Sequence, residues 1–215
     1  MTSPALPQVV LASRNKKKSA EIDALLRPWG IHVIPVSDFD NVPEIVEDGE
    51  TFAANAAKKA IETARIVKHW TIGEDSGLRV DALKGAPGVY SARYSGPGAT
   101  DERNNEKLIK ELESVETDGR GGEYVCHVAV SDPEGNQRLA VEATCRGRIT
   151  HEARGANGFG YDPYFEIIEY HQTFGELSRL VKQTLSHRAR AFRRLIPQLV
   201  QVLHAGHGSD SADKT

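Results

Sequence analysis

The sequence has few cysteines and no cysteine pair of the CxxC type. Its 215 residues include two cysteines, Cys126 and Cys145, and a single methionine. Both cysteines stand in strand-like segments, without a cluster of zinc-binding spacing around them. A disulfide framework and a cysteine-based zinc site are therefore not expected, and we interpret both residues as buried free thiols in a reducing compartment.

Long apolar runs and a strong excess of one charge are also missing. No stretch approaches the roughly 18 consecutive apolar residues of a membrane-spanning helix, and the N-terminus lacks a basic patch followed by an apolar run. The net charge is -3, which argues against broad binding to nucleic acid but allows a local basic pocket. We expect a cytoplasmic protein that binds neither membranes nor nucleic acid.

The order of apolar patterns predicts one α/β domain over residues 8–203, with flexible tails at 1–7 and 204–215. Strands are predicted at 8–12, 31–36, 70–73, 78–80, 124–131 and 138–149, the last two joined as a hairpin. Helices are predicted from Ser19 to a stop at Pro28 and Gly30 with Trp29 on the inner face, at 51–68, at 101–113 and from Ser186. Loops are predicted at 37–50, 84–99 and 154–162.

Ser13, Asn15 and Lys18 follow the first predicted strand and precede a helix. Such a turn exposes backbone N–H groups and the positive end of the helix. A hydroxyl, an amide and an ammonium can all donate to phosphate oxygens, although the glycines of a Walker A loop are missing. The residues fit a phosphate site, and they also fit an ordinary solvated basic turn.

Glu47, Glu74 and Asp75 are candidate ligands for a metal ion. The run Gly73-Glu74-Asp75-Ser76-Gly77 predicts a turn at a strand end that holds two adjacent acids. Adjacent carboxylates repel each other unless a cation is near, and Mg²⁺ prefers one or two carboxylates together with phosphates and waters. The alternative is an exposed acidic loop in which one acid caps a helix.

The predicted helix 51–68 places Lys59 on one face with Phe52 and Asn55. A lysine there could reach a phosphate as a point charge, or it could be a solvated neighbour of Lys58.

The glycines around Phe159 would let its ring stand exposed and stack on a base, worth about 1–3 kcal/mol, unless the ring packs in the core. Further donors gather around the start of the last helix, where cations oppose the helix dipole. They are Lys182, Ser186, His187 and Arg188. A capped helix with a basic first turn is the alternative.

Together these segments resemble the inosine triphosphate pyrophosphatase family, in order and spacing, from about Gln8 to Leu203. The resemblance rests on Ser13-x-Asn15-x-x-Lys18, Gly49-x-Thr51-Phe52-x-x-Asn55-Ala56, Glu74-Asp75-Ser76-Gly77-Leu78, Gly85 to Tyr94, Gly158 to Pro163 and Ser186-His187-Arg188. It implies a mixed β-sheet flanked by helices, two lobes with a central substrate cleft, a homodimer and Mg²⁺. It also implies hydrolysis of the purine nucleoside triphosphates ITP, dITP and XTP to the monophosphate and pyrophosphate.

The same resemblance assigns roles to the candidate residues. Ser13, Asn15, Lys18 and Lys59 would contact the triphosphate. Glu47 and Asp75 would bind the metal, with Glu74 supporting them or ligating as well, and Asp75 would accept a proton. Ser76 would line the same segment, and the base pocket would consist of Phe159, Gly160, Tyr161, Asp162, Lys182, Ser186, His187 and Arg188. The sequence departs from the family where Arg14 replaces a common glycine and where Glu74 replaces an aspartate common in bacterial members.

We expect a hydrolase in which the Asp75 carboxylate orients or deprotonates a water molecule that attacks a phosphorus. A carboxylate with a pKa near 4 is a weak base, so the metal should contribute more to activating the water. Donors from Lys182 and the His187 region would accept a 6-keto purine and reject adenine. Two alternatives stay open: an enzyme for modified pyrimidine triphosphates, and a nucleotide-binding module without catalytic activity.

Overall fold

The computed structural model describes residues 7–209, in which β-strands and α-helices alternate up to β4 and are followed by three further strands and two helices. The strands are β1 (Gln8–Leu11), β2 (His32–Pro35), β3 (Thr71–Val80), β4 (Gly121–Ser131), β5 (Gln137–Ile149), β6 (Phe165–Ile167) and β7 (Gln172–Thr173). The helices are α1 (Lys16–Leu26), α2 (Phe52–Val67), α3 (Asp101–Glu111), α4 (Arg179–Leu185) and α5 (His187–Ser209).

The strands form one mixed sheet, as predicted. It has seven strands in the order β2-β1-β3-β4-β5-β6-β7. β1 pairs in parallel with β2 and β3, whereas β6 pairs antiparallel with β5 and β7. Connections through α1 and α2 are long enough for parallel pairing, and the tight β4–β5 turn gives antiparallel pairing.

The chain divides into two compact units. Within the described range, unit 1 comprises residues 7–74, 127–142 and 191–209, and unit 2 comprises Asp75–Cys126 and Ala143–Arg190. The chain passes from unit 1 to unit 2 between Glu74 and Asp75, in the middle of β3. Whether residues 8–203 act as a single domain stays a prediction.

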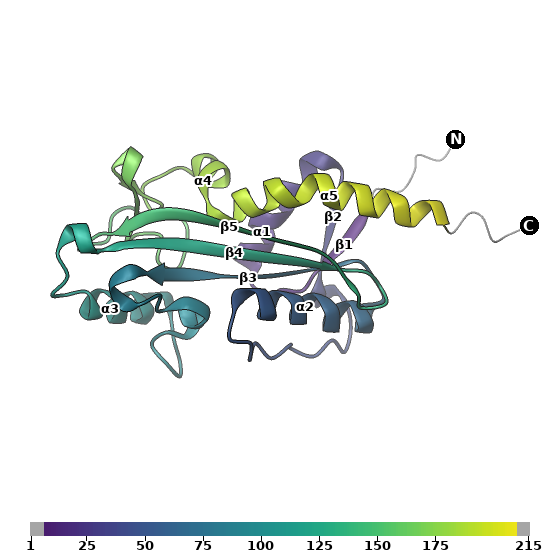
Figure 1. Cartoon of the computed structure of the whole chain (residues 1–215), viewed down its shortest axis with the longest axis horizontal. Coiled ribbons are helices and arrows are strands. Elements are labelled where there is room, and N and C mark those ends of the chain that lie inside the picture. The colour runs from purple at the N-terminus through teal and green to yellow at the C-terminus, as the bar shows by residue number, and fades with distance from the viewer. Residues whose placement is uncertain (1–6, 210–215) are drawn as a thin grey trace, which may run out of the picture. The chain divides into compact units, whose positions relative to one another are not determined.

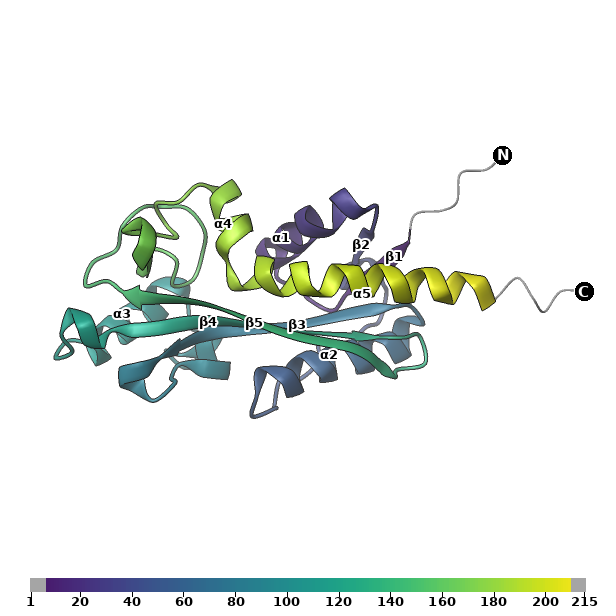
Figure 2. The ribbon, with the colours of Figure 1, turned by 45° about the horizontal axis from the view of Figure 1, so that its top comes forward.

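In unit 1, helices cover both faces of the strands. Figures 1 and 2 show α2 on one face and the long α5 on the other. Small side chains let α2 lie close to the sheet, because Ala56 and Ala60 pack against Ala129 of β4. Thr51 caps α2 by accepting a hydrogen bond from the Ala54 amide, as its predicted start requires.

In unit 2, α3 and α4 lie on opposite faces of β4 and β5 (Figure 2). The apolar core of this unit combines strand residues with the loop before β6, and includes Leu78, Tyr124, Phe165 and Phe174. Both cysteines are buried free thiols, as predicted, and burial raises the pKa of Cys145 to about 11.

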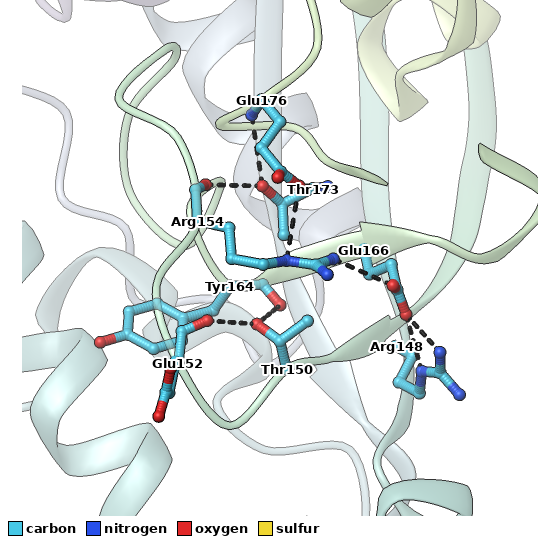
Figure 3. A network of polar contacts seen from close by, with 8 residues as sticks. All are labelled: Arg148, Thr150, Glu152, Arg154, Tyr164, Glu166, Thr173 and Glu176. Atoms are coloured by element: carbon cyan, nitrogen blue, oxygen red, sulfur yellow. Dashed lines mark hydrogen bonds and ion pairs between the residues drawn. The ribbon is translucent and has the colours of Figure 1, made fainter. Parts of the chain in front are cut away.

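A network of ion pairs and hydrogen bonds joins β5, β6 and the segment after β7 in unit 2 (Figure 3). Glu166 of β6 is 4% exposed and accepts hydrogen bonds from Arg148 Nε at 2.8 Å and from Arg154 Nη2 at 2.9 Å. Arg154 also faces Glu176, whose Oε2 accepts the Thr173 amide. Burial opposes ionisation of Glu166, but the two arginines outweigh it and lower its pKa below the ordinary value.

Several predicted elements need correction. The run Gly73 to Gly77 is not a turn but the interior of β3, which is continuous from Thr71 to Val80. Its glycines and acids are typical of turns, but here the strand is buried and Gly73 is required by a close helix. A Cβ on Gly73 would lie 2.1 Å from the Ala56 carbonyl oxygen of α2.

Helix positions also differ from the prediction. α1 begins at Lys16, because Asn15 caps it, and not at Ser19. Trp29 is 59% exposed and does not face the core. The short β6, β7 and α4 were not predicted, and α5 continues to Ser209 beyond the predicted end at Leu203. The tail predicted at 204–215 is therefore wrong as far as Ser209, and the remaining parts of the predicted tails, 1–6 and 210–215, lie outside the described residues.

Among the helices that the structure describes, none combines the length and the apolar composition that crossing a membrane requires.

Candidate functional site

The predicted site residues fall into two clusters, one in each unit. The unit 1 cluster consists of Ser13, Asn15, Lys18, Glu47, Lys59 and Glu74. The unit 2 cluster consists of Asp75, Ser76, Phe159, Asp162, Lys182, Ser186, His187 and Arg188. The consecutive residues Glu74 and Asp75 of β3 link the two clusters along the chain.

In the unit 1 cluster, Asn15 organises the turn between β1 and α1. Its Oδ1 accepts hydrogen bonds from the amides of Lys17 at 3.0 Å and Lys18 at 3.2 Å. The backbone amide of Asn15 donates to Ser13 Oγ. The first turn of α1 contains three lysines and no acid. Their positive charges are unfavourable at the positive end of the helix dipole unless an anion is bound. This arrangement favours the phosphate site over a plain basic turn.

Lys18 pairs with Glu74 inside unit 1. Its Nζ donates to Glu74 Oε2 at 2.9 Å, and the side chains are 18% and 0% exposed. An ionised glutamate at this depth requires a compensating cation. The neighbouring Arg14 donates to the Val42 carbonyl oxygen, so it anchors the loop before α2 instead of interrupting the turn.

Lys59 of α2 pairs with Glu47 of the preceding loop at 3.0 Å. The Lys59 side chain is 9% exposed and that of Glu47 is 35% exposed, so the carboxylate retains contact with water. Asn55 is fully buried, and its Oδ1 accepts the Gly49 amide at 2.8 Å, which ties the loop to the helix. The motif Gly49-x-Thr51-x-x-x-Asn55 is thus a device that fixes the loop carrying Glu47.

Strand geometry separates Glu74 from Asp75. Successive side chains of an extended strand project to opposite faces. Gly73 lies against α2, whereas Glu74 contacts Lys18 of α1. By alternation Asp75 shares the face of Gly73, and Glu74 projects to the other face. The two adjacent acids therefore act on different faces of β3.

In the unit 2 cluster, Asp75 and Ser76 begin the segment of β3 that belongs to this unit. Asp75 is 5% exposed, and its Oδ1 accepts the Ser76 amide at 3.1 Å. Ser76 Oγ accepts a hydrogen bond from Arg188 Nη2 at 3.0 Å. Arg188 is 2% exposed, so α5 places a buried guanidinium beside β3.

Asp162 is the centre of the remaining polar contacts in unit 2. Its Oδ2 accepts from Lys182 Nζ at 2.6 Å and from the Phe159 amide at 2.8 Å. The Lys182 ammonium also lies 4.6 Å from the centroid of the half-buried Phe159 ring. These contacts join the glycine-rich loop to α4, and they give Asp162 a positioning role.

His187 and Ser186 stand at the start of α5. Ser186 Oγ accepts the Ala189 amide, which confirms it as the cap of the helix. The His187 ring is stacked on Tyr124, with centroids 4.6 Å apart. Tyr161 lies in the core of unit 2 and its hydroxyl donates to the Ser91 carbonyl oxygen at 2.7 Å, so contact with a base stays a prediction for this residue.

Three further residues support the glycine-rich loop, and the sequence did not single them out. Asp101 and Asn105 of α3 bind the Gly160 amide and carbonyl, each at 2.9 Å. Tyr124 of β4 donates to Asp162. Asp101 and Asn105 stand four apart on one helix face, which is a usable signal, whereas the isolated Tyr124 gives none.

The carboxylates of the unit 1 cluster are candidate ligands for Mg²⁺. Over the described part of the chain there is no group of three or more acidic, histidine or cysteine side chains suited to hold a metal ion. Mg²⁺ needs only one or two carboxylates when phosphates and waters complete its shell, so the donor set fits the ion. Glu47 keeps contact with water, whereas Glu74 is fully buried on Lys18, which favours Glu47 as a ligand.

The chain is similar to known proteins over most of its length. A dITP/XTP pyrophosphatase of Rhodopirellula baltica is 54% identical over 94% of this chain and 97% of the relative. One of Desulforamulus reducens is 46% identical over 87% and 92%. A solved HAM1 protein from Coxiella burnetii has a TM-score of 0.83 at 38% identity, covering 91% of this chain and 99% of its own. A nucleoside-triphosphatase / dITP/XTP pyrophosphatase from Mycobacterium abscessus has a TM-score of 0.72 at 37% identity, covering 89% and 99%.

The mixed seven-stranded sheet and its helices define an α/β protein, and a buried lysine–carboxylate pair lies in each unit. The model of the Ham1 family matches residues 9–198. The chain belongs to the Ham1 family.

Proposed function

We propose that this protein hydrolyses the non-canonical purine nucleoside triphosphates ITP, dITP and XTP to the nucleoside monophosphate and pyrophosphate. The observation that carries the proposal is the burial of Glu74 and Asp75 in the middle of β3, at 1% and 5% exposure. Two consecutive buried carboxylates are costly to fold and are retained where charged partners or ligands compensate them. Membership of the Ham1 family supports the substrate class, which is the one named for the relatives.

The unit 1 cluster would bind the phosphates. The capped turn at Asn15 offers amides at the start of α1, and Lys18 and Lys59 offer ammonium groups held in place by carboxylates. A triphosphate has several negative charges, so Lys18 would donate to it while Glu74 keeps the ammonium in position, and Lys59 would exchange its contact with Glu47 for a phosphate oxygen. Donors fixed before the substrate arrives need little reorganisation in the reaction.

Glu47 and Asp75 would hold Mg²⁺, and Glu74 would hold Lys18. When bound, the ion supplies neutralisation of phosphate charge and lowers the pKa of a coordinated water. Asp75 would orient a water molecule toward the α-phosphorus and accept its proton. The water oxygen forms a bond to that phosphorus while the bond to the bridging oxygen breaks, and pyrophosphate leaves with the electron pair.

The unit 2 cluster would select the base. Lys182 and His187 would donate to the 6-keto oxygen of hypoxanthine or xanthine, and Phe159 would stack on the ring. Adenine carries an amino group at this position, so a buried donor would stay unpaired. Arg188, buried beside Ser76, would fix the start of α5 against β3.

Action in the cytoplasm as a homodimer belongs to the same proposal; the dimer rests on the resemblance in the sequence, and the cytoplasm rests on the composition. Sedimentation of the purified chain tests the dimer, since a monomer at assay concentration would contradict it.

The test is a panel of ITP, XTP, ATP, GTP and a modified pyrimidine triphosphate, with and without Mg²⁺. We expect pyrophosphate release with kcat/KM for ITP at least about tenfold above ATP and GTP, which corresponds to about 1.4 kcal/mol. Preference for the pyrimidine would support the rival enzyme class, and tight binding of ITP without turnover would support a silent binding module.

A further inference from the structure

Tyr124 of β4 contacts two members of the unit 2 cluster. Its ring is stacked on the His187 imidazole, with centroids 4.6 Å apart and planes inclined by 10°. Its hydroxyl donates to Asp162 Oδ1 at 3.4 Å. Tyr124 is 7% exposed, so both contacts lie away from water. One strand residue therefore links the glycine-rich loop to the first residue of α5.

Asp162 also binds Lys182 and the Phe159 amide, which belong to the proposed base pocket. The Tyr124 hydroxyl approaches Oδ1, whereas Lys182 Nζ and the Phe159 amide both bind Oδ2. The plane of the carboxylate thus sets where the Lys182 ammonium stands. Since that ammonium also lies over the Phe159 ring, a rotation of Asp162 would move a donor and disturb a stacking surface together.

We propose that Tyr124 is a positioning residue that sets the discrimination between 6-keto and 6-amino purines, by fixing Asp162 and His187; this inference rests on the proposed function. Tyr124 acts through its neighbours and does not touch the substrate. Burial, and then the charge of Asp162, raises the pKa of the phenol well above its ordinary value. The hydroxyl consequently remains a neutral donor at every pH where the enzyme would work.

Altering Tyr124 is expected to weaken binding of ITP and to leave binding of ATP unchanged. A keto oxygen depends on donors at fixed positions, so a loosened Asp162 weakens binding of ITP. The amino group of ATP does not accept a hydrogen bond from these donors and loses nothing. A tyrosine that only filled the core would, when altered, affect the two nucleotides alike.

The first experiment compares Tyr124→Phe with Tyr94→Phe in the full-length chain. Tyr124→Phe keeps the ring stacked on His187 and removes the hydroxyl. Tyr94→Phe is the matched control, because its hydroxyl donates to a different carboxylate, that of Glu111 of α3, and not to Asp162. We expect the KM for ITP to rise about threefold to tenfold in Tyr124→Phe, which is the range for the net contribution of one ordinary hydrogen bond. kcat for ITP and KM for ATP should stay unchanged, and Tyr94→Phe should match the wild type.

The second experiment is a double-mutant cycle with Asp162→Asn, read by calorimetric binding of inosine monophosphate. If Tyr124 acts through Asp162, adding Tyr124→Phe to Asp162→Asn should change the affinity by less than about 1.5-fold. Thermal melting of every variant checks that the protein is folded. The first experiment decides alone if Asp162→Asn does not fold.

An unchanged KM for ITP in Tyr124→Phe, or equal losses for ITP and ATP, would overturn the inference and leave the proposed function intact. The inference would also be overturned if Tyr124→Phe weakened binding of inosine monophosphate equally in the wild-type protein and in Asp162→Asn. A wild-type protein without preference for ITP overturns the proposed function, and this inference falls with it.

Discussion

At the residue scale, the role of Asp75 differs from that of Glu74 because the two side chains leave β3 on opposite faces. Glu74 is bound to Lys18, and Asp75 lies beside Ser76. The sequence identified both acids as candidates for one metal ion. It did not separate them, because a turn allows adjacent side chains to converge and a strand does not.

Replacing Asp75 by asparagine would remove the proposed proton acceptor and keep the shape of the side chain. We expect turnover of ITP to fall by about 10²- to 10⁴-fold, the contribution of a positioned general base, while binding of ITP changes much less. Steady-state kinetics and calorimetry measure the two effects. Asp118→Asn, on the exposed surface, is the control. Near-wild-type turnover in Asp75→Asn would rule out its catalytic role.

Lys58 and Lys59 form a natural pair for comparison, since they are adjacent on α2 and each is paired with an acid. Lys59 is buried beside Glu47, whereas Lys58 is paired with the exposed Asp48. We expect Lys59→Met to lower kcat/KM for ITP by about tenfold or more, because a preorganised cation would be lost from the phosphate site. Lys58→Met should change it by less than about twofold. Equal effects of the two substitutions would remove Lys59 from the site.

At the element scale, long elements with clear periodicity were predictable and short ones were not. α2 and the β4–β5 hairpin lie where caps, apolar spacing and the turn at Gly135 predict them. β6 and β7 hold three and two residues, too few for a periodic pattern. The error at β3 has a different cause. Gly73 serves close packing against α2, and the sequence gives no sign of that neighbour.

The packing of β3 on α2 predicts the effect of Gly73→Ala. The new Cβ would lie 2.1 Å from the Ala56 carbonyl oxygen and 2.6 Å from the Ala60 amide nitrogen, so strand and helix must separate. We expect the free energy of unfolding to fall by about 1–3 kcal/mol, measured by urea denaturation. In the control Gly119→Ala, the Cβ would meet a Val115 methyl group at 3.0 Å, which can move. An unchanged urea midpoint in Gly73→Ala would contradict the close contact.

The Glu166 network predicts how stability depends on pH. Arg148 and Arg154 hold the folded-state pKa of Glu166 below its ordinary value, so the paired carboxylate stabilises the protein above the unfolded-state pKa of about 4.3. That contribution is lost as the pH falls through the lower folded-state pKa. Glu166→Gln lacks it at every pH.

We therefore expect Glu166→Gln to be less stable than the wild type at pH 7, with a difference that shrinks as the pH falls below about 4. Chemical denaturation at a series of pH values measures it. A difference that is constant with pH would show that the charge of Glu166 contributes nothing.

At the scale of the whole molecule, sequence reasoning reached the α/β class and the Ham1 family, because motifs far apart in the chain keep their order and spacing. It did not reach the contacts that hold those motifs in place, even where it named the residue. Asn55 fixes the loop of Glu47, and Tyr124 fixes Asp162. Such supporting contacts join segments distant in sequence, so no local pattern marks them.

The central claim is attack by water on the α-phosphorus of a 6-keto purine triphosphate. Turnover of ITP with Mg²⁺ in water enriched in heavy oxygen tests it most directly, with mass spectrometry of both products. We expect the label to appear in inosine monophosphate and pyrophosphate to be unlabelled. Label in pyrophosphate, or release of inosine diphosphate and phosphate, would contradict it.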